Sequence, residues 1–326
     1  MKIYRVRLSL DSASLSAWQS DTIFGHLCWT VRYNEGEEAL SQFLAPFLAG
    51  EPPLILSNGF PEDLLPRPVL PPSAPPGLEM PKRDQVAVMR RARESKGIKY
   101  VDLDEFNAIC QGERVPLKPK EARVESRTVL KNQINRLTGT TAGPEAEEAV
   151  GGNLYDLEEA FYLKKNGLIG KKAPVPISIY LKVVNDSWAE RAKTLFDQMA
   201  LAGFGAKKSA GYGQFKVESF EPFDGFAVPE GANGFISLSN FVPARDDPVD
   251  GHYRTLVKYG KLGEEFASNG AISPFKFPLL MLAAGATFRD DNPKDYYGRM
   301  VAGIHPQVND IVQYGYAFAV PMILAP

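Results

Sequence analysis

The spacing of apolar and polar residues predicts strands and helices in a regular order along the first part of the chain. Residues 2–10 alternate between apolar and polar side chains, as a half-buried strand does. Apolar residues then recur at helical spacing after Ser20 or Asp21, either of which is a typical N-cap. A second helix is expected over residues 37–48, and short strand segments follow it, one of them at residues 64–68.

The same order returns later in the chain. Residues 175–184 give the clearest strand pattern of the sequence. A helix capped by Asp186 or Ser187 is expected to run to Leu201, and residues 214–220 alternate as a further strand. With the first part of the chain this gives βαββαβ, the ferredoxin-like order, and therefore an α+β fold.

A change in composition divides the chain into parts. Prolines and then dense mixed charges from about residue 80 to 165 indicate a long insertion, in which two alternating segments predict a protruding β-hairpin. We therefore expect an N-terminal ferredoxin-like domain over residues 1–220 that carries this insertion. Residues 221–326 are richer in strand patterns than in helix patterns, and a second, degenerate ferredoxin-like domain is expected there.

Charge becomes informative only when it is examined locally. The 326 residues carry 37 Lys and Arg against 39 Asp and Glu, so net charge does not draw the whole molecule to a polyanion. Residues 80–136 hold 14 basic and 8 acidic residues, whereas residues 137–163 hold 6 acidic and no basic ones. Cys28 and Cys110 stand far apart, which argues against a disulfide scaffold or a zinc site and favours a cytoplasmic protein.

A glycine loop over residues 203–213 is the sharpest candidate site. Glycines permit positive φ and close approach of a ligand to the backbone, while lysines and a hydroxyl suit phosphate groups. The loop follows a helix and precedes a strand, and it fits neither the Walker A nor the GxGxxG pattern. The alternative is an ordinary helix-to-strand turn with solvated lysines. The candidate RNA-binding residues are Gly203, Gly205, Lys207, Lys208, Ser209, Gly211, Tyr212 and Gly213.

A second candidate surface lies in the predicted hairpin. Basic, amide and hydroxyl side chains occur there among β-branched residues, a mixture that suits single-stranded RNA. The alternative is a solvated hairpin face. The candidate residues are Arg127, Lys131, Asn132, Asn135 and Arg136.

The sequence offers little support for a catalytic site or a metal site. His26, His252 and His305 are the three histidines, and none has metal-ligand spacing, so no metal or other cofactor is expected. His26 could serve as a general base for RNA cleavage if it lies near the glycine loop, although an ordinary helix residue is the simpler interpretation. Asp246–Asp247 and Asp290–Asp291 are adjacent pairs in loops, whose side chains point to opposite faces of an extended chain.

Several of these segments together resemble the fourth subunit of type III-A CRISPR (Csm) effector complexes, a member of the RAMP superfamily. The glycine loop is typical of the superfamily, whereas the combination of segments, spread over nearly the whole chain, is similar to this subunit. The segments are Ser20–Leu27, Leu65–Pro68, Ile134–Thr140, Gly203–Phe215 and Gln313–Phe318.

The resemblance implies a non-catalytic RNA-binding subunit. It would hold the 5′ repeat-derived handle of the crRNA, contact the large polymerase-palm subunit and the backbone RAMP subunit, and place the hairpin as a thumb near target RNA. No membrane association is implied. Two alternatives remain open, namely a metal-independent RAMP endoribonuclease that cuts CRISPR repeats with His26, and a generic RRM-like binder, although the chain lacks the aromatic RNP1 pattern.

Overall fold

The N-terminal part of the chain folds around one antiparallel sheet. The computed structural model describes residues 1–71, 82–83, 85–86, 90, 97–120, 123–132, 134, 139, 141, 154–166, 171–268 and 271–325. The elements of the N-terminal part are β1 (Lys2–Leu10), α1 (Ser20–Glu35), α2 (Glu37–Leu48), β2 (Leu54–Pro61), β8 (Ile177–Val183), α5 (Asp186–Ala202), the 3₁₀ turn η1 (Lys208–Ala210) and β9 (Phe215–Pro222).

The strand order of this sheet confirms the ferredoxin-like prediction. The order is β2-β8-β1-β9, and all three pairings are antiparallel. The two central strands are therefore the first and third of the βαββαβ unit, which is the arrangement expected for two interleaved βαβ halves. Helices α1 and α5 contact each other.

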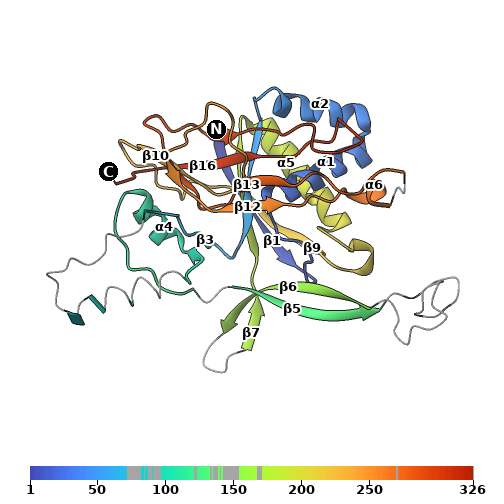
Figure 1. Cartoon of the computed structure of the whole chain (residues 1–326), viewed down its shortest axis with the longest axis horizontal. Helices are drawn as coiled ribbons and strands as arrows, with labels where there is room; N and C mark the ends of the chain where they lie inside the picture. The colour runs from blue at the N-terminus through green and yellow to red at the C-terminus, as the bar shows by residue number, and fades with distance from the viewer. Residues whose placement is uncertain are drawn as a thin grey trace.

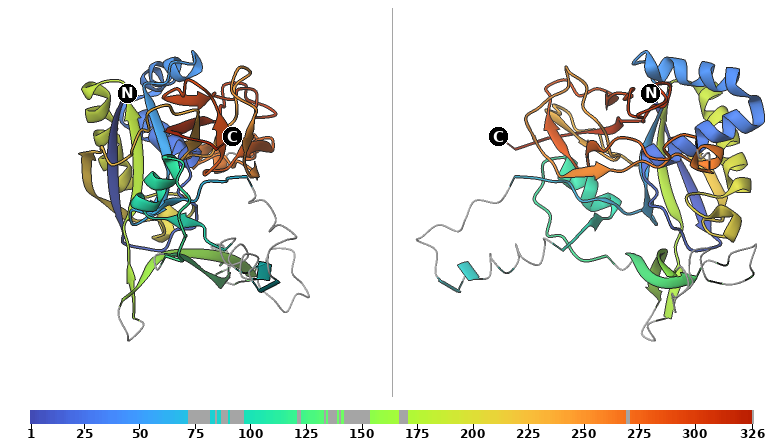
Figure 2. Two further views of the ribbon diagram at one scale, coloured as in Figure 1. Left: turned by 90° about the vertical axis from the view of Figure 1, so that its left-hand side faces the viewer. Right: turned by 45° about the vertical axis from the view of Figure 1, so that its right-hand side comes forward.

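Strand β8 is buried on both of its faces. All seven of its residues are buried, including Ser178 and Lys182. In the right-hand view of Figure 2 the N-terminal sheet stands between the helices and the C-terminal half of the chain. A strand covered on both faces has no solvent side, so alternation is not required of its sequence.

The insertion supplies a β-hairpin that projects from the body of the molecule, as predicted (Figure 1). Strands β5 and β6 pair antiparallel over ten residue pairs, from Arg123–Leu163 to Asn132–Leu154, and we call these two strands the thumb hairpin. Two backbone hydrogen bonds between Ser14 and Ala160, of 3.0 and 2.8 Å, join its root to the body. The elements of the insertion are β3 (Leu65–Pro66), β4 (Tyr100–Val101), α4 (Leu103–Cys110), β5 (Arg123–Asn132), β6 (Leu154–Asn166) and β7 (Lys171–Pro174).

The C-terminal half is built mainly of strands. Its larger sheet has the order β11-β14-β10-β16-β15, and β12 pairs with β13 beside it. Within residues 234–268 and 271–325, the one α-helix is short, which accounts for the weak helix patterns in the sequence. The elements are β10 (Gly234–Ser237), β11 (Gly251–His252), β12 (Thr255–Lys258), α6 (Glu264–Ser268), β13 (Leu279–Leu282), β14 (Thr287–Arg289), β15 (Tyr296–Gly298) and β16 (Tyr316–Met322).

One hydrophobic cluster spans both halves of the chain, and two smaller clusters lie within the C-terminal half. The main cluster of buried residues extends from strands β1, β2 and β8 into β10 and β16. Two buried tyrosine hydroxyls form hydrogen bonds between the halves. The Tyr314 hydroxyl accepts a 3.0 Å hydrogen bond from the backbone N–H of Leu56, and the Tyr316 hydroxyl donates a 2.6 Å hydrogen bond to the carbonyl of Phe47. The division into two domains near residue 220 stays a prediction.

The start of α1 differs from the prediction. The N-cap is Gln19, whose side chain makes no capping hydrogen bond, rather than Ser20 or Asp21. The backbone N–H of Ser20 instead donates to Asn58 Oδ1 at 2.9 Å, so a side chain of β2 satisfies the helix end. Such a cap from a distant residue leaves no local signal in the sequence.

The start of α5 was also misplaced, by one residue. Asn185, not Asp186 or Ser187, is the N-cap, and its Oδ1 accepts a 3.0 Å hydrogen bond from the backbone N–H of Trp188. Three consecutive residues of capping type made the position ambiguous. Among the helices of the described residues, none is both long and apolar enough to cross a membrane.

The α5 cap gives a test of stability. Asn185→Ala is expected to lower the free energy of unfolding by about 1 kcal/mol, because it leaves an N–H of the first helical turn without its acceptor. Urea denaturation measures the change. Ser187→Ala is the matched control and is expected to have little effect; equal losses in both variants would contradict the assignment of the cap.

Candidate nucleic-acid interface

A buried aromatic side chain fixes the glycine loop to the body of the molecule. The Phe204 ring is fully buried and stacks on Trp18, with ring centroids 3.8 Å apart and planes 12° apart. The ring of His26 lies 4.9 Å from it on helix α1. Because Phe204 lies within the loop, its burial stabilises a defined loop conformation rather than an open turn.

The glycines serve mainly to let the loop pack closely. All four have positive φ, as predicted. A Cβ on Gly213 would lie 1.8 Å from the carbonyl oxygen of Phe204, and one on Gly205 would lie 2.7 Å from the side chain of Ser16. Both positions therefore require glycine for two reasons, since the conformation is left-handed and there is no room for a side chain.

Most amides of the loop are used within the protein. Those of Phe204 and Gly213 donate to the carbonyls of Gly213 and Ala13 at 2.8 and 2.9 Å, and that of Gly211 donates to Lys208 at 2.9 Å. The amide of Gly203 continues the helical bonding of α5. The glycine amides themselves are thus not available to a ligand, which the sequence pattern alone did not reveal.

His26 belongs to this internal bonding. Its Nε2 accepts a 2.9 Å hydrogen bond from the backbone N–H of Gly205. Burial, and to a lesser degree the charge of Lys208, lowers the pKa of His26 to about 3. A neutral imidazole whose Nε2 already holds a loop amide is a poor general base. The geometry thus favours the simpler interpretation of His26, as a residue that positions the loop.

Three consecutive amides remain unpaired at the tip of the loop. In the described part of the chain, the N–H groups of Lys207, Lys208 and Ser209 make no hydrogen bond. Lys207 is left-handed, with φ 56° and ψ 36°, and the η1 turn follows it directly. A left-handed residue followed by helical ones turns successive N–H groups to one concave side, an arrangement called a nest that binds anions.

The two loop lysines have different surroundings. Lys207 is exposed, and its Nζ lies 3.9 Å from the ring centroid of Tyr155 on the thumb hairpin. Lys208 forms an ion pair with Glu264 of α6, and 19% of its side chain is exposed. The charge of Lys207 is therefore accessible to solvent, whereas Glu264 offsets that of Lys208.

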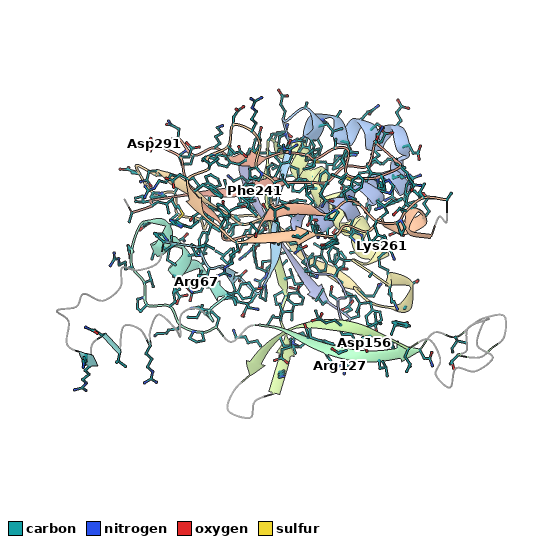
Figure 3. All side chains as sticks on the ribbon, in the orientation of Figure 1. Arg67, Arg127, Asp156, Phe241, Lys261 and Asp291 are labelled. Carbon is teal, nitrogen blue, oxygen red and sulfur yellow. The ribbon has the colours of Figure 1, made fainter. Side chains whose placement is uncertain are left out.

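The thumb hairpin turns one face toward the glycine loop. Residues two apart on a strand share a face, so Arg127 and Lys131 lie on the same side of β5, and the pairing places Glu159 and Tyr155 opposite them. The loop contacts these same residues of β6. Asn132 lies on the other face, so the structure separates it from the two basic residues; Figure 3 labels Arg127 on the hairpin below the body of the molecule.

Glu159 joins the glycine loop to the thumb hairpin, a contact that no local sequence pattern indicated. Its Oε1 accepts from the Tyr212 hydroxyl at 2.7 Å, and its Oε2 accepts from Arg127 Nη2 at 2.6 Å. These hydrogen bonds, from Arg127 and then Tyr212, lower the pKa of Glu159. Tyr212, one of the predicted RNA-binding residues, thus has its hydroxyl bound to the thumb hairpin.

Two predicted residues, Asn135 and Arg136, lie outside the described residues. Within the described ranges, no cluster of three His, Cys, Asp or Glu side chains could hold a metal ion. His252 lies on β11, and His305 Nε2 lies 2.8 Å from the carbonyl of Ser273, far in the chain from the loop.

The lowered pKa of His26 predicts how stability depends on pH. The pKa is 6.5 in the unfolded chain and about 3 in the folded one, so between these values the unfolded state binds more protons. The free energy of unfolding is therefore expected to fall as pH drops from 7 to 5, by about 2 kcal/mol from this residue.

His26→Gln isolates this contribution, because a Gln Oε1 replaces the acceptor without titrating. Urea denaturation at pH 7 and pH 5 is expected to show a smaller pH dependence for this variant than for the unmodified protein. An unchanged pH dependence would contradict the burial of a neutral His26.

Comparison with known proteins gives structural matches alone. No protein-family model and no curated protein matches the sequence. A chain of a Csm1-Csm4 cassette in complex with pppApA matches with a TM-score of 0.59 and 18% identity, covering 100% of this chain and 99% of the other. The same cassette in complex with cA4 gives a TM-score of 0.61 at 16% identity, with both chains covered fully.

A chain of the Csm3-Csm4 subcomplex of the type III-A CRISPR-Cas interference complex matches with a TM-score of 0.61 and 13% identity, covering 99% of this chain and 100% of that one. Csm4 is the component that the cassette and the subcomplex have in common. The chain therefore has the fold of the chains that it matches in these Csm1-Csm4 and Csm3-Csm4 assemblies.

Proposed function

We propose that this chain is a non-catalytic RNA-binding subunit of a type III CRISPR effector complex and holds the 5′ repeat-derived handle of the crRNA. The observation that carries the proposal is the set of unpaired amides at Lys207, Lys208 and Ser209, beside an exposed lysine. Backbone amides in a nest bind a phosphodiester without regard to base identity.

The thumb hairpin extends this surface. Arg127 and Lys131 lie on the face that contacts the glycine loop, so a strand bound at the loop tip would continue along basic side chains. Glu159 takes up part of the charge of Arg127, which leaves Lys207 and Lys131 as the main cations toward a phosphate backbone. Single-stranded RNA suits such a surface of cations and aromatic rings, Tyr155 among them.

The partners follow from the complexes in which the fold occurs. The matching chains come from assemblies with Csm1 or with Csm3, and we infer that this chain contacts a large polymerase-palm subunit and a backbone RAMP subunit in the same way. The thumb hairpin would then lie near target RNA. Such a complex would act in the cytoplasm, and co-purification with the products of neighbouring genes, followed by extraction of the bound RNA, tests the assembly.

Charge reversal of Lys207 tests the phosphate site. Lys207→Glu is expected to weaken binding of a single-stranded crRNA handle and to reduce the slope of log affinity against log salt concentration by about 1, since one cation–phosphate contact is lost. Fluorescence anisotropy across a salt series measures both. Lys193→Glu on α5, the same charge change away from the loop, is the control.

An unchanged affinity and slope for Lys207→Glu would reject the loop tip as the phosphate site. A loss of equal size in Lys193→Glu would show that only net charge matters. Lys208→Glu is expected to lose stability as well as affinity, because it replaces an ion pair with Glu264 by a repulsion.

The absence of catalysis has its own test. Incubation with CRISPR repeat RNA in EDTA is expected to leave the RNA intact, because the Nε2 of His26 is occupied by Gly205 and its pKa is low. Denaturing gel electrophoresis detects cleavage. Sequence-specific cleavage that disappears in His26→Ala would instead establish an endoribonuclease.

A further inference from the structure

A cavity opens beside the glycine loop, between helices α1, α5 and α6. Its volume is about 250 Å³, which is below the roughly 300 to 1,000 Å³ of sites for drug-sized molecules and suits one planar group. Figure 1 and the right-hand view of Figure 2 both place α6 beside α1 and α5. Lys208 and Glu264 line it on the side of the loop, so it adjoins the unpaired amides.

One wall of the cavity is aromatic. Trp29 and Tyr33, one turn apart on α1, stack with ring centroids 5.4 Å apart and planes 28° apart. Tyr33 is 59% exposed although it is a large aromatic residue. The guanidinium carbon of Arg32 lies 5.0 Å from the centroid of the Trp29 ring and 5.2 Å from that of Phe266 on α6, so Arg32 links the two rings. An exposed ring at the mouth of a cavity offers a stacking surface to a flat ligand.

Polar groups with unused hydrogen-bonding capacity line the other walls of the cavity. Asn34 Nδ2 donates to Gln198 Oε1 at 3.0 Å, which leaves the Asn34 oxygen as an acceptor and the Gln198 nitrogen as a donor. His26 is neutral with Nε2 as acceptor, so its proton is on Nδ1, which has no partner in the described part of the chain. Donors and acceptors beside an aromatic wall match the edge and the face of a nucleobase.

We propose that this cavity holds one unstacked nucleobase of an RNA whose adjoining phosphate rests on the amides of Lys207, Lys208 and Ser209. The inference rests on the proposed function, because the same RNA must occupy both places. Lys208 belongs to both, since its amide lies at the loop tip and its side chain lines the cavity. The base would stack on Tyr33 and bond through its edge to Asn34 and Gln198.

Ala202→Trp is the variant that tests the proposal. Ala202 is exposed at the end of α5 and lines the cavity, so a larger side chain fills the space without removing a core contact. Leu48→Trp, at an exposed position at the end of α2, is the matched control, and Tyr33→Ala removes the stacking surface by a different route. Thermal unfolding verifies that each variant is folded.

The probe is a synthetic RNA octamer of fixed mixed sequence, together with eight derivatives that each lack one base. Binding of the full chain is measured by fluorescence anisotropy. For the unmodified protein, removal of one particular base is expected to weaken binding about tenfold, as loss of a stacked base does. Ala202→Trp and Tyr33→Ala are expected to bind the intact octamer about as weakly as the unmodified protein binds the derivative that lacks this base. Leu48→Trp is expected to bind the intact octamer about tenfold more tightly than that derivative, as the unmodified protein does.

The outcomes separate this proposal from the proposed function. Equal affinities for all nine RNAs, with a salt dependence that still requires Lys207, would reject the base site and leave the phosphate site standing. No salt-dependent binding of any octamer would reject both. An unchanged profile in Ala202→Trp, accompanied by loss of co-purifying subunits, would show that the cavity takes a protein side chain and would overturn the proposal.

Discussion

The burial of Phe204 against Trp18 is the interaction on which the rest of the interface depends. A loop of four glycines has a large conformational entropy when unconstrained, and ordering it is costly. The stacked ring, the bond from Gly205 to His26 and the close approach of Gly213 to the backbone of Phe204 together fix one conformation. Only then do the amides at the tip take a constant arrangement and adjoin the cavity.

Contacts between the two halves of the chain orient helix α1, which lies beside the glycine loop. Asp21 at the start of α1 accepts from Gln313 at 2.6 Å and pairs with Lys258 at 2.9 Å, and both partners come from the C-terminal half. Lys276 approaches the same network, and burial lowers its pKa to about 8. Helix α1 carries His26, Trp29 and Tyr33, so these contacts orient the helix that forms one side of the interface.

Local patterns were sufficient for the architecture of the N-terminal half. The strand patterns of β1 and β8 and the apolar spacing of α5 depend on residues near one another in sequence, and each element begins and ends within two residues of its predicted bounds. The helix caps were harder to predict, because the acceptor for the first N–H of α1 is the side chain of Asn58, 38 residues away from Ser20. The weakly patterned C-terminal half has short strands, whose sequences carry little periodic information.

The candidate site was only partly visible in the sequence. The glycine loop and the basic hairpin could be found separately, and their contact through Glu159 and Tyr212 could not, because 53 residues separate the two partners. The period of two along β5 does separate Arg127 and Lys131 from Asn132, so that distinction was available. Trp29 and Tyr33 left a weak signal, an aromatic pair four residues apart on an amphipathic helix.

The attachment of the thumb hairpin has a mechanical consequence. The bonds between Ser14 and Ala160 hold it near one end, while Leu154 at the other end of β6 lies six residues further on, or about 20 Å along an extended strand. The contact between Lys207 and Tyr155 lies one residue from Leu154, so the glycine loop supports the hairpin near both ends of this length, and a tilt requires that this contact open. A tilt of about 10° about Ala160 would displace Leu154 by about 3.5 Å, roughly one residue along a strand.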